Sequence, residues 1–225
     1  MVLGSATVAA AASVSALLLA GGSGQVPTTH VGHKTQAAFL GWSASPTKPA
    51  IGQLTAADTS CRLSLVQLPP INKGTVGVSL VPELNDVRGP FTVTVFGNGT
   101  QNEALCVSTS KASSAIRWFA TSGTSPSPGT ITDDQVSYGA RDGQPYTLVV
   151  GRIGTGVTGV TLSLENGDNV TTTSGNGLFV AWWPGSQRIT SATIATASGA
   201  STQPSNLAGP GNGNSTVCLH HGCGR

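Results

Sequence analysis

The chain has 225 residues, of which 9% are charged and 38% hydrophobic, and its formal net charge is +2. A typical globular domain is about 25% charged, so few side chains are available here for acid–base catalysis or for neutralising the phosphates of a nucleic acid. We therefore expect no enzyme activity, no cofactor and no nucleic-acid partner. One folded domain is expected, because a domain takes roughly 100 to 200 residues.

The N-terminal segment is apolar and uncharged, since the first charged residue is Lys34. About 20 apolar residues in a helix cross the roughly 30 Å hydrocarbon layer of a bilayer, so residues 1–24 are predicted to be a membrane anchor. A cleaved signal peptide and a buried core helix are the alternatives; the basic region that typically precedes a signal peptide is missing. An upstream cytoplasmic part would account for this. Residues 25–36 are predicted to be a linker.

A single soluble helix is predicted over residues 55–68, where apolar residues recur three and four positions apart. Thr55 is a suitable N-cap, and Pro69 and Pro70 end the pattern. The apolar face of such a helix must pack against something. The residues that form this face are Leu54, Ala57, Cys61, Leu65 and Leu68.

The helix is followed by segments in which apolar and polar residues alternate, as they do in β-strands. The predicted fold class is α+β and mainly β: an antiparallel sheet with one packed helix, preceded by the N-terminal apolar helix. This domain spans residues 37–198, and residues 199–225 form a disordered tail rich in Gly, Asn, Ser and Pro that is dispensable for stability. The predicted strands cover residues 91–96, 104–107, 115–119, 135–138, 146–153, 157–164, 178–183 and 188–197.

Two of the four cysteines, Cys61 and Cys106, fall inside the predicted domain. A disulfide between them would place the domain in an oxidising, extracytoplasmic compartment; two buried thiols are the alternative. The helix that carries Cys61 must cover the sheet that carries Cys106, so we expect their Cα atoms to lie about 4.4 to 6.8 Å apart. Cys218 and Cys223 in the tail are a possible second disulfide.

The tail also contains candidate reactive groups. Cys218, His220, His221 and Cys223 are weak metal-ligand candidates, because four donors within six residues can hardly all reach one tetrahedral ion. The segment His221 to Cys223 resembles the motif of L,D-transpeptidases, which would make Cys223 the nucleophile of a cell-wall enzyme. No predicted strand or helix holds this segment, however, so a frayed tail is the favoured interpretation.

The predicted domain contains no histidine, because His30, His33, His220 and His221 all lie in the linker or the tail. This excludes a Ser-His-Asp or Cys-His mechanism within it. Residues 108–111 match the S-x-x-K pattern of penicillin-recognising enzymes, which place it on a helix. Here it follows a strand, and we interpret it as a polar loop.

Trp182 and Trp183 are adjacent, so in a strand their side chains point to opposite faces. One is expected to fill the core. The other, Trp183, would then stand beside Phe179 on the opposite face as a candidate binding surface, able to stack on a sugar or to contact a protein partner. The alternative is that both faces of the strand are covered.

Four segments, at residues 88–92, 141–152, 157–167 and 176–185, resemble those of an uncharacterised family of actinobacterial extracytoplasmic proteins with an Ala-Trp-Trp-Pro-Gly block. The resemblance covers roughly residues 39–197. It implies a membrane-anchored or secreted domain and supplies no catalytic residue. We therefore expect a non-catalytic binding or signalling domain at the cell envelope, attached to the membrane through its N-terminal segment, with cell-wall glycan or an envelope protein as the partner.

Overall fold

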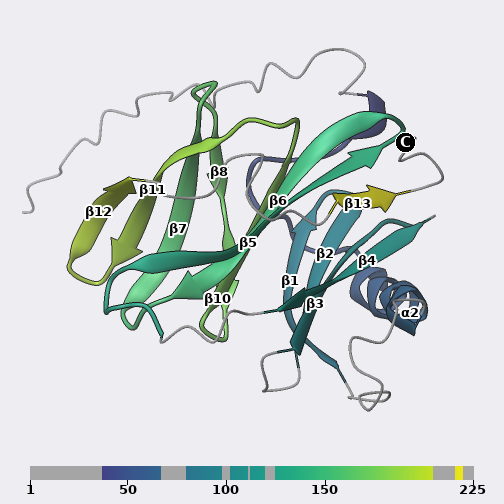
Figure 1. Ribbon diagram of the computed structural model, residues 1–225, viewed down its shortest axis with the longest axis horizontal. Helices are drawn as coiled ribbons and strands as arrows, with labels where there is room; N and C mark the ends of the chain where they lie inside the picture. Colours follow the sequence, from purple (N-terminus) through teal and green to yellow (C-terminus); the bar gives the residue numbers. More distant parts are fainter. Residues whose placement is uncertain are drawn as a thin grey trace, which may run out of the picture.

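The computed structural model describes residues 37–66, 80–97, 102–110, 112–119, 125–204 and 216–219. Within these residues the chain forms the helix α2 and three β-sheets stacked in layers, with α2 at one end of the stack (Figure 1). The predicted anchor over residues 1–24 and the linker over residues 25–36 lie outside the described part. No helix in the described ranges is long and apolar enough to cross a membrane.

Each sheet has a simple order of strands, and all described strand pairs are antiparallel except β13 with β5. The first sheet consists, in order, of β1 (Val81–Arg88), β2 (Phe91–Gly97), β3 (Asn102–Ser108) and β4 (Ser113–Phe119). The central sheet consists of β13 (Thr216–Leu219), β5 (Ile131–Arg141), β6 (Gln144–Ile153), β10 (Leu178–Pro184) and β9 (Thr173–Gly175). The third sheet consists of β12 (Gly199–Pro204), β11 (Ile189–Thr196), β7 (Val157–Leu164) and β8 (Asn169–Thr171).

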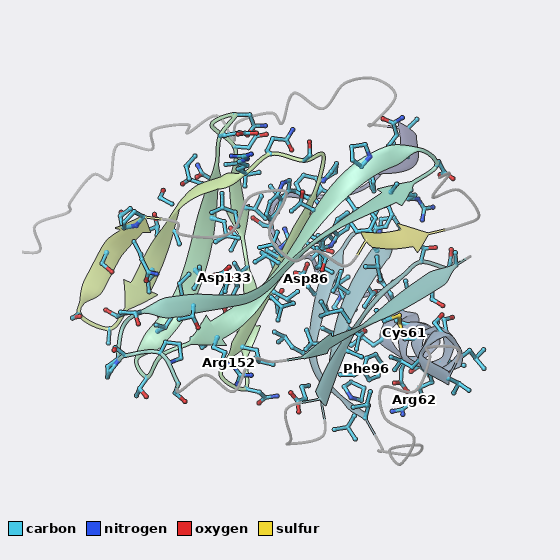
Figure 2. All side chains as sticks on the ribbon, in the orientation of Figure 1. Cys61, Arg62, Asp86, Phe96, Asp133 and Arg152 are labelled. Carbon is cyan, nitrogen blue, oxygen red and sulfur yellow. A yellow bond between two sulfur atoms is a disulfide. The ribbon has the colours of Figure 1, made fainter. Side chains whose placement is uncertain are left out.

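The helix α2 (Gln53–Val66) packs on the outer face of the first sheet. Cys61 of α2 and Cys106 of β3 form a disulfide with 5.7 Å between their Cα atoms, which confirms the predicted pairing. Both cysteines are fully buried, and Phe96 lies in the same small core (Figure 2). The bond is consistent with an extracytoplasmic protein.

The start of α2 differs from the prediction. The helix begins at Gln53, and its first turn is closed by a hydrogen bond from the Ala56 amide to the Gly52 carbonyl, so Thr55 lies inside the helix and is not its N-cap. The predicted apolar face is also only partly buried: Ala57 is covered, whereas Leu54 is 38% exposed. The helix is therefore attached over a narrow contact that contains the disulfide.

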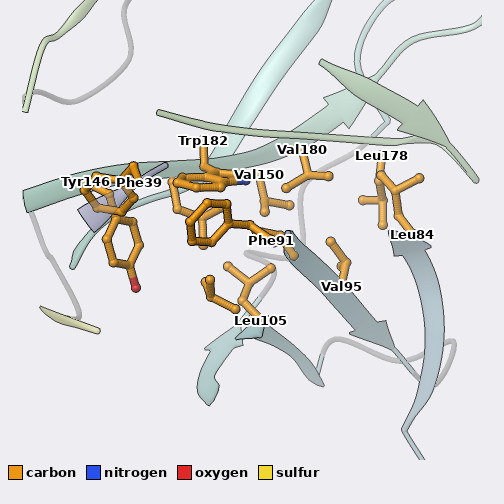
Figure 3. Close-up of a cluster of buried hydrophobic side chains, with 13 residues drawn as sticks. Phe39, Leu84, Phe91, Val95, Leu105, Tyr146, Val150, Leu178, Val180 and Trp182 are labelled. Atoms are coloured by element: carbon orange, nitrogen blue, oxygen red, sulfur yellow. The ribbon is translucent and has the colours of Figure 1, made fainter. Parts of the chain in front are cut away.

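The central sheet is covered on one face by the first sheet and on the other by the third sheet. The prediction of a single sheet therefore did not include these two covering layers. Every residue of β10 is buried. Leu178, Val180 and Trp182 point into a core shared with the first sheet, and they face Phe91 and Leu84 (Figure 3). The alternate residues of β10 point into a second core that the third sheet closes. The two cores make the stack of sheets one continuous structure.

Five of the observed strands, β1, β8, β9, β12 and β13, were not predicted, and the two longest of them, β1 and β12, lack apolar alternation. β1 contains Pro82 and two charged residues, Asp86 and Arg88, that are fully buried. β12 is almost entirely exposed and pairs with β11 as an edge strand. β12 lies wholly beyond the predicted boundary at residue 198, and β13 also falls within the predicted tail, so the described structure continues past that boundary.

Candidate functional site

The described residues line an open pocket of about 530 Å³ between the start of α2, the turn that joins β1 to β2, and the end of β3. A volume of this size is typical of sites for small molecules. Its walls come from three segments that are far apart in the sequence. The lining residues are Ala50, Ile51, Gly52, Gln53, Ala56, Ala57, Gly89, Pro90, Thr92, Ser108, Thr109 and Ser110.

The turn between β1 and β2 requires a glycine at position 89. Gly89 has a positive φ of 60°, and a Cβ atom there would lie 2.0 Å from the Gly41 carbonyl oxygen. Any side chain would push the segment around residue 41 away from the turn. This close approach sets the position of Gly89 and Pro90, which form one wall of the pocket.

Gln53, the first residue of α2, joins the walls through its side-chain amide. Its Nε2 donates hydrogen bonds to the Gly89 carbonyl (2.9 Å) and to Thr92 Oγ1 (3.2 Å), and its Oε1 accepts one from the Ala50 amide (2.9 Å). One side chain thereby ties the turn before α2 to the first sheet. The start of α2 is held against β2 by directed bonds.

The opposite wall carries hydroxyl groups at the end of β3. Ser108 and Thr92 are each 1% exposed, and Ser108 Oγ donates to the Thr92 carbonyl over 3.3 Å. Thr109 and Ser110 follow along the chain and also line the pocket. This segment is the one that matches the S-x-x-K pattern. Ser108 is the last residue of β3, so the segment is not on a helix, as expected. Lys111 lies outside the described residues.

The disulfide joins the same two elements, α2 and β3, that line the pocket. Cys61 is one helical turn after Ala57, and Cys106 is two residues before Ser108 on β3, so each cysteine is a near neighbour of a lining residue. Residues two apart in a strand share a face, and residues four apart in a helix do the same. The bond between Cys61 and Cys106 therefore fixes the spacing of the two walls.

The described lining contains no Asp, Glu, Lys, Arg, His or Cys. Its polar groups are hydroxyls, one amide and the backbone, which can hydrogen-bond a ligand and have no tendency to exchange protons near neutral pH. The part of the chain that the structure describes also holds no group of three or more His, Cys, Asp or Glu that could bind a metal ion. The pocket is therefore suited to binding by shape and hydrogen bonds.

Trp183 and Phe179 do not form the binding surface that was considered for them. Trp183 is 1% exposed and Phe179 is fully buried, because the third sheet covers the face of β10 on which they lie. The indole Nε1 of Trp183 donates to the Gln187 carbonyl over 3.2 Å. The alternative stated above, that both faces of the strand are covered, is the arrangement found.

The candidate reactive groups of the C-terminal segment lie mostly beyond the described residues. Cys218 belongs to β13, whose backbone pairs with that of β5 at Ala140. His220, His221 and Cys223 lie outside the described part of the chain. The metal site, the second disulfide and the transpeptidase nucleophile thus stay predictions from the sequence.

Sequence reasoning did not find the pocket, because its residues are small and carry no recognisable motif. Comparisons of the chain with protein-family models, with curated proteins and with solved structures found no match. The fold and the geometry of the pocket therefore carry the functional argument.

Proposed function

We propose that the chain is a non-catalytic binding or signalling domain of the cell envelope, anchored or secreted through its N-terminal segment, and that the pocket beside α2 is its binding site. The observation that carries this proposal is a pocket of small-molecule size whose described lining has no ionisable side chain. The resemblance to extracytoplasmic proteins with an Ala-Trp-Trp-Pro-Gly block and the buried disulfide both support the location.

The burial of the tryptophan pair changes which ligands are favoured. A sugar ring would have stacked on Trp183 at an open face, and that face is covered. The pocket offers no aromatic ring in its described lining. Trp183 was the reason to consider cell-wall glycan as the ligand, and it is buried. We therefore favour a ligand that fits the pocket.

The experiment compares the domain with a variant whose pocket is filled. Ala56 lines the pocket from an exposed position on α2, so Ala56→Leu adds volume there at little cost to the helix. Thr59→Leu is the matched control, because Thr59 is exposed on the same helix and is not a lining residue. Each protein is incubated with an extract of the cell envelope, repurified and examined by native mass spectrometry.

We expect an added mass on the unmodified domain and on Thr59→Leu, and its loss on Ala56→Leu. The unfolding midpoints of the three proteins are measured first, so that a loss of binding is not a loss of folding. An unmodified domain without any added mass, or equal occupancy in Ala56→Leu, would contradict the proposal.

A further inference from the structure

The apolar part of the pocket is aliphatic and is not closed over. Ala50, Ile51, Ala56, Ala57 and Pro90 supply it, and Ile51 is completely exposed (106%). The free energy falls when a ligand removes a large apolar side chain from water. An apolar ligand in the pocket would cover the exposed side chain of Ile51, and this burial would favour binding.

The described lining of the pocket has no charged side chain, which disfavours binding of an ionised ligand. A charge that leaves water must be paired or hydrogen-bonded to repay its loss of solvation. No lysine, arginine, aspartate or glutamate is among the described lining residues. The charged residues of α2, Arg62 and Asp58, form an exposed ion pair with each other, with 3.0 Å between Arg62 Nε and Asp58 Oδ2. The part of a ligand that enters the pocket is thus expected to be neutral.

The lining also acts against flat ring systems. Aromatic side chains bind sugars and planar rings by offering an extended apolar face, and the described lining contains no Phe, Tyr or Trp. Small residues such as Ala56, Ala57 and Gly52 leave an open space between helix and turn. Flexible aliphatic chains fill such a space without needing a flat partner.

From these three observations we infer that the pocket binds a small, uncharged aliphatic molecule. The inference rests on the proposed function and specifies the chemical class of its ligand. Of the hydroxyl residues on the opposite wall, Ser108 is buried and donates to the Thr92 carbonyl, and Thr109 is hydrogen-bonded to Ala112, so the exposed Ser110 is the one placed to meet a polar group of the ligand.

The test uses three probes with the isotopically labelled domain. 1-Hexanol is neutral and aliphatic, hexanoate has the same chain with a charged end, and methyl β-D-glucoside is a neutral sugar. Backbone amide shifts of the first turn of α2 and of Ser108 to Ser110 are followed during titration. We expect saturable shifts with 1-hexanol in the unmodified domain and in Thr59→Leu, their loss in Ala56→Leu, and at least ten-fold weaker binding of hexanoate and of the glucoside.

The outcomes separate this inference from the proposed function. Tighter binding of hexanoate or of the glucoside at the same amides would overturn the ligand class and leave the pocket as the binding site. The absence of any saturable shift with 1-hexanol would also overturn the ligand class; the added mass in the envelope experiment then decides independently whether the pocket binds anything.

Discussion

Arg88 and Asp86 lie two residues apart on β1 and form an ion pair that is completely buried, with 2.6 Å between Arg88 Nε and Asp86 Oδ2. The guanidinium also donates to the carbonyls of Ala44 (2.8 Å) and Thr171 (2.6 Å), and Thr173 Oγ1 donates to Asp86 Oδ1 (2.6 Å). Burial raises the pKa of Asp86, and the adjacent Arg88 opposes that rise. The pair thus links the first sheet to the stretch before α2, at Ala44, and to β8 and β9.

Removing one partner of this pair is expected to be far worse than removing both. Asp86→Ala leaves the guanidinium buried without its counter-charge, which costs about 3 to 5 kcal/mol. The double variant Asp86→Leu/Arg88→Met removes both charges and should be the more stable of the two. Urea unfolding of both proteins checks this. Asp58→Ala, which breaks the exposed pair with Arg62, is the control and should cost less than about 1 kcal/mol.

Trp182→Ala and Trp183→Ala should destabilise the domain to a similar degree, by about 3 to 5 kcal/mol each. Trp182 fills the core between the first and central sheets, and Trp183 fills the core between the central and third sheets. Chemical denaturation of the two variants measures this. A Trp183→Ala protein as stable as the parent would show that the third sheet does not cover β10.

Replacing the disulfide should lower stability and loosen the pocket. The bond closes a loop of 45 residues, and the chain-entropy model assigns about 4 kcal/mol to a loop of this size. Cys61→Ala/Cys106→Ala should therefore unfold at lower denaturant concentration and bind the pocket probe more weakly. Because both cysteines are fully buried, dithiothreitol should reduce the bond only once denaturant is present, as alkylation and mass spectrometry will show. Rapid reduction of the native domain would contradict this burial.

Tyr146 has a buried hydroxyl without a hydrogen-bond partner, and its burial raises the pKa of the phenol. Above about pH 10 the unfolded chain ionises at this residue and the folded protein does not, so the wild-type domain loses stability as the pH rises further. Tyr146→Phe should be at least as stable as the parent at pH 8 and should lack this part of the alkaline loss. Unfolding free energies at pH 8 and pH 11 test both statements. An equal loss in both proteins would exclude Tyr146 as its source.

Gln203 joins β12 to the central sheet through its side chain. Its Nε2 donates to the Ile131 carbonyl (3.0 Å) and its Oε1 accepts from the Ile131 amide (3.3 Å). Gln203→Ala should cost about 1 to 2 kcal/mol, since two hydrogen bonds are lost. Thr202→Ala, on the same exposed strand, should have little effect. If the two variants unfold at the same midpoint, the hydrogen bonds of the Gln203 side chain add nothing to the stability of the domain.

The sequence predicted the strands that alternate and could not predict what covers them. β7 alternates between buried and partly exposed positions and was predicted with correct bounds. β10 is an unbroken apolar run that is compatible with one covered face or two, and only the tertiary structure decides between them. β1 was missed because two of its four buried residues are the charged Asp86 and Arg88, whose burial depends on hydrogen-bond partners from distant parts of the chain.

The candidate site was harder to predict than the fold. The disulfide between Cys61 and Cys106 followed from a helix that had to cover a sheet. The pocket beside it has no such signal: its shape comes from Gln53 bridging a turn to a strand and from the contact of Gly89 with Gly41. Small residues in loops show no periodic pattern in the sequence. Only the three-dimensional structure shows that they come together to form the pocket.

The double coverage of β10 has a consequence for the nascent chain. Leu178 to Trp183 is a run of six apolar residues without a charge or a proline, which is the composition of an aggregation-prone segment. One face of this run needs β11, and the residues of β11 are synthesised after it. The segment therefore stays partly uncovered until residues 189–196 have emerged. Pro184 ends the run and Arg188 follows shortly after, and both residue types act against strand-to-strand association of incomplete chains.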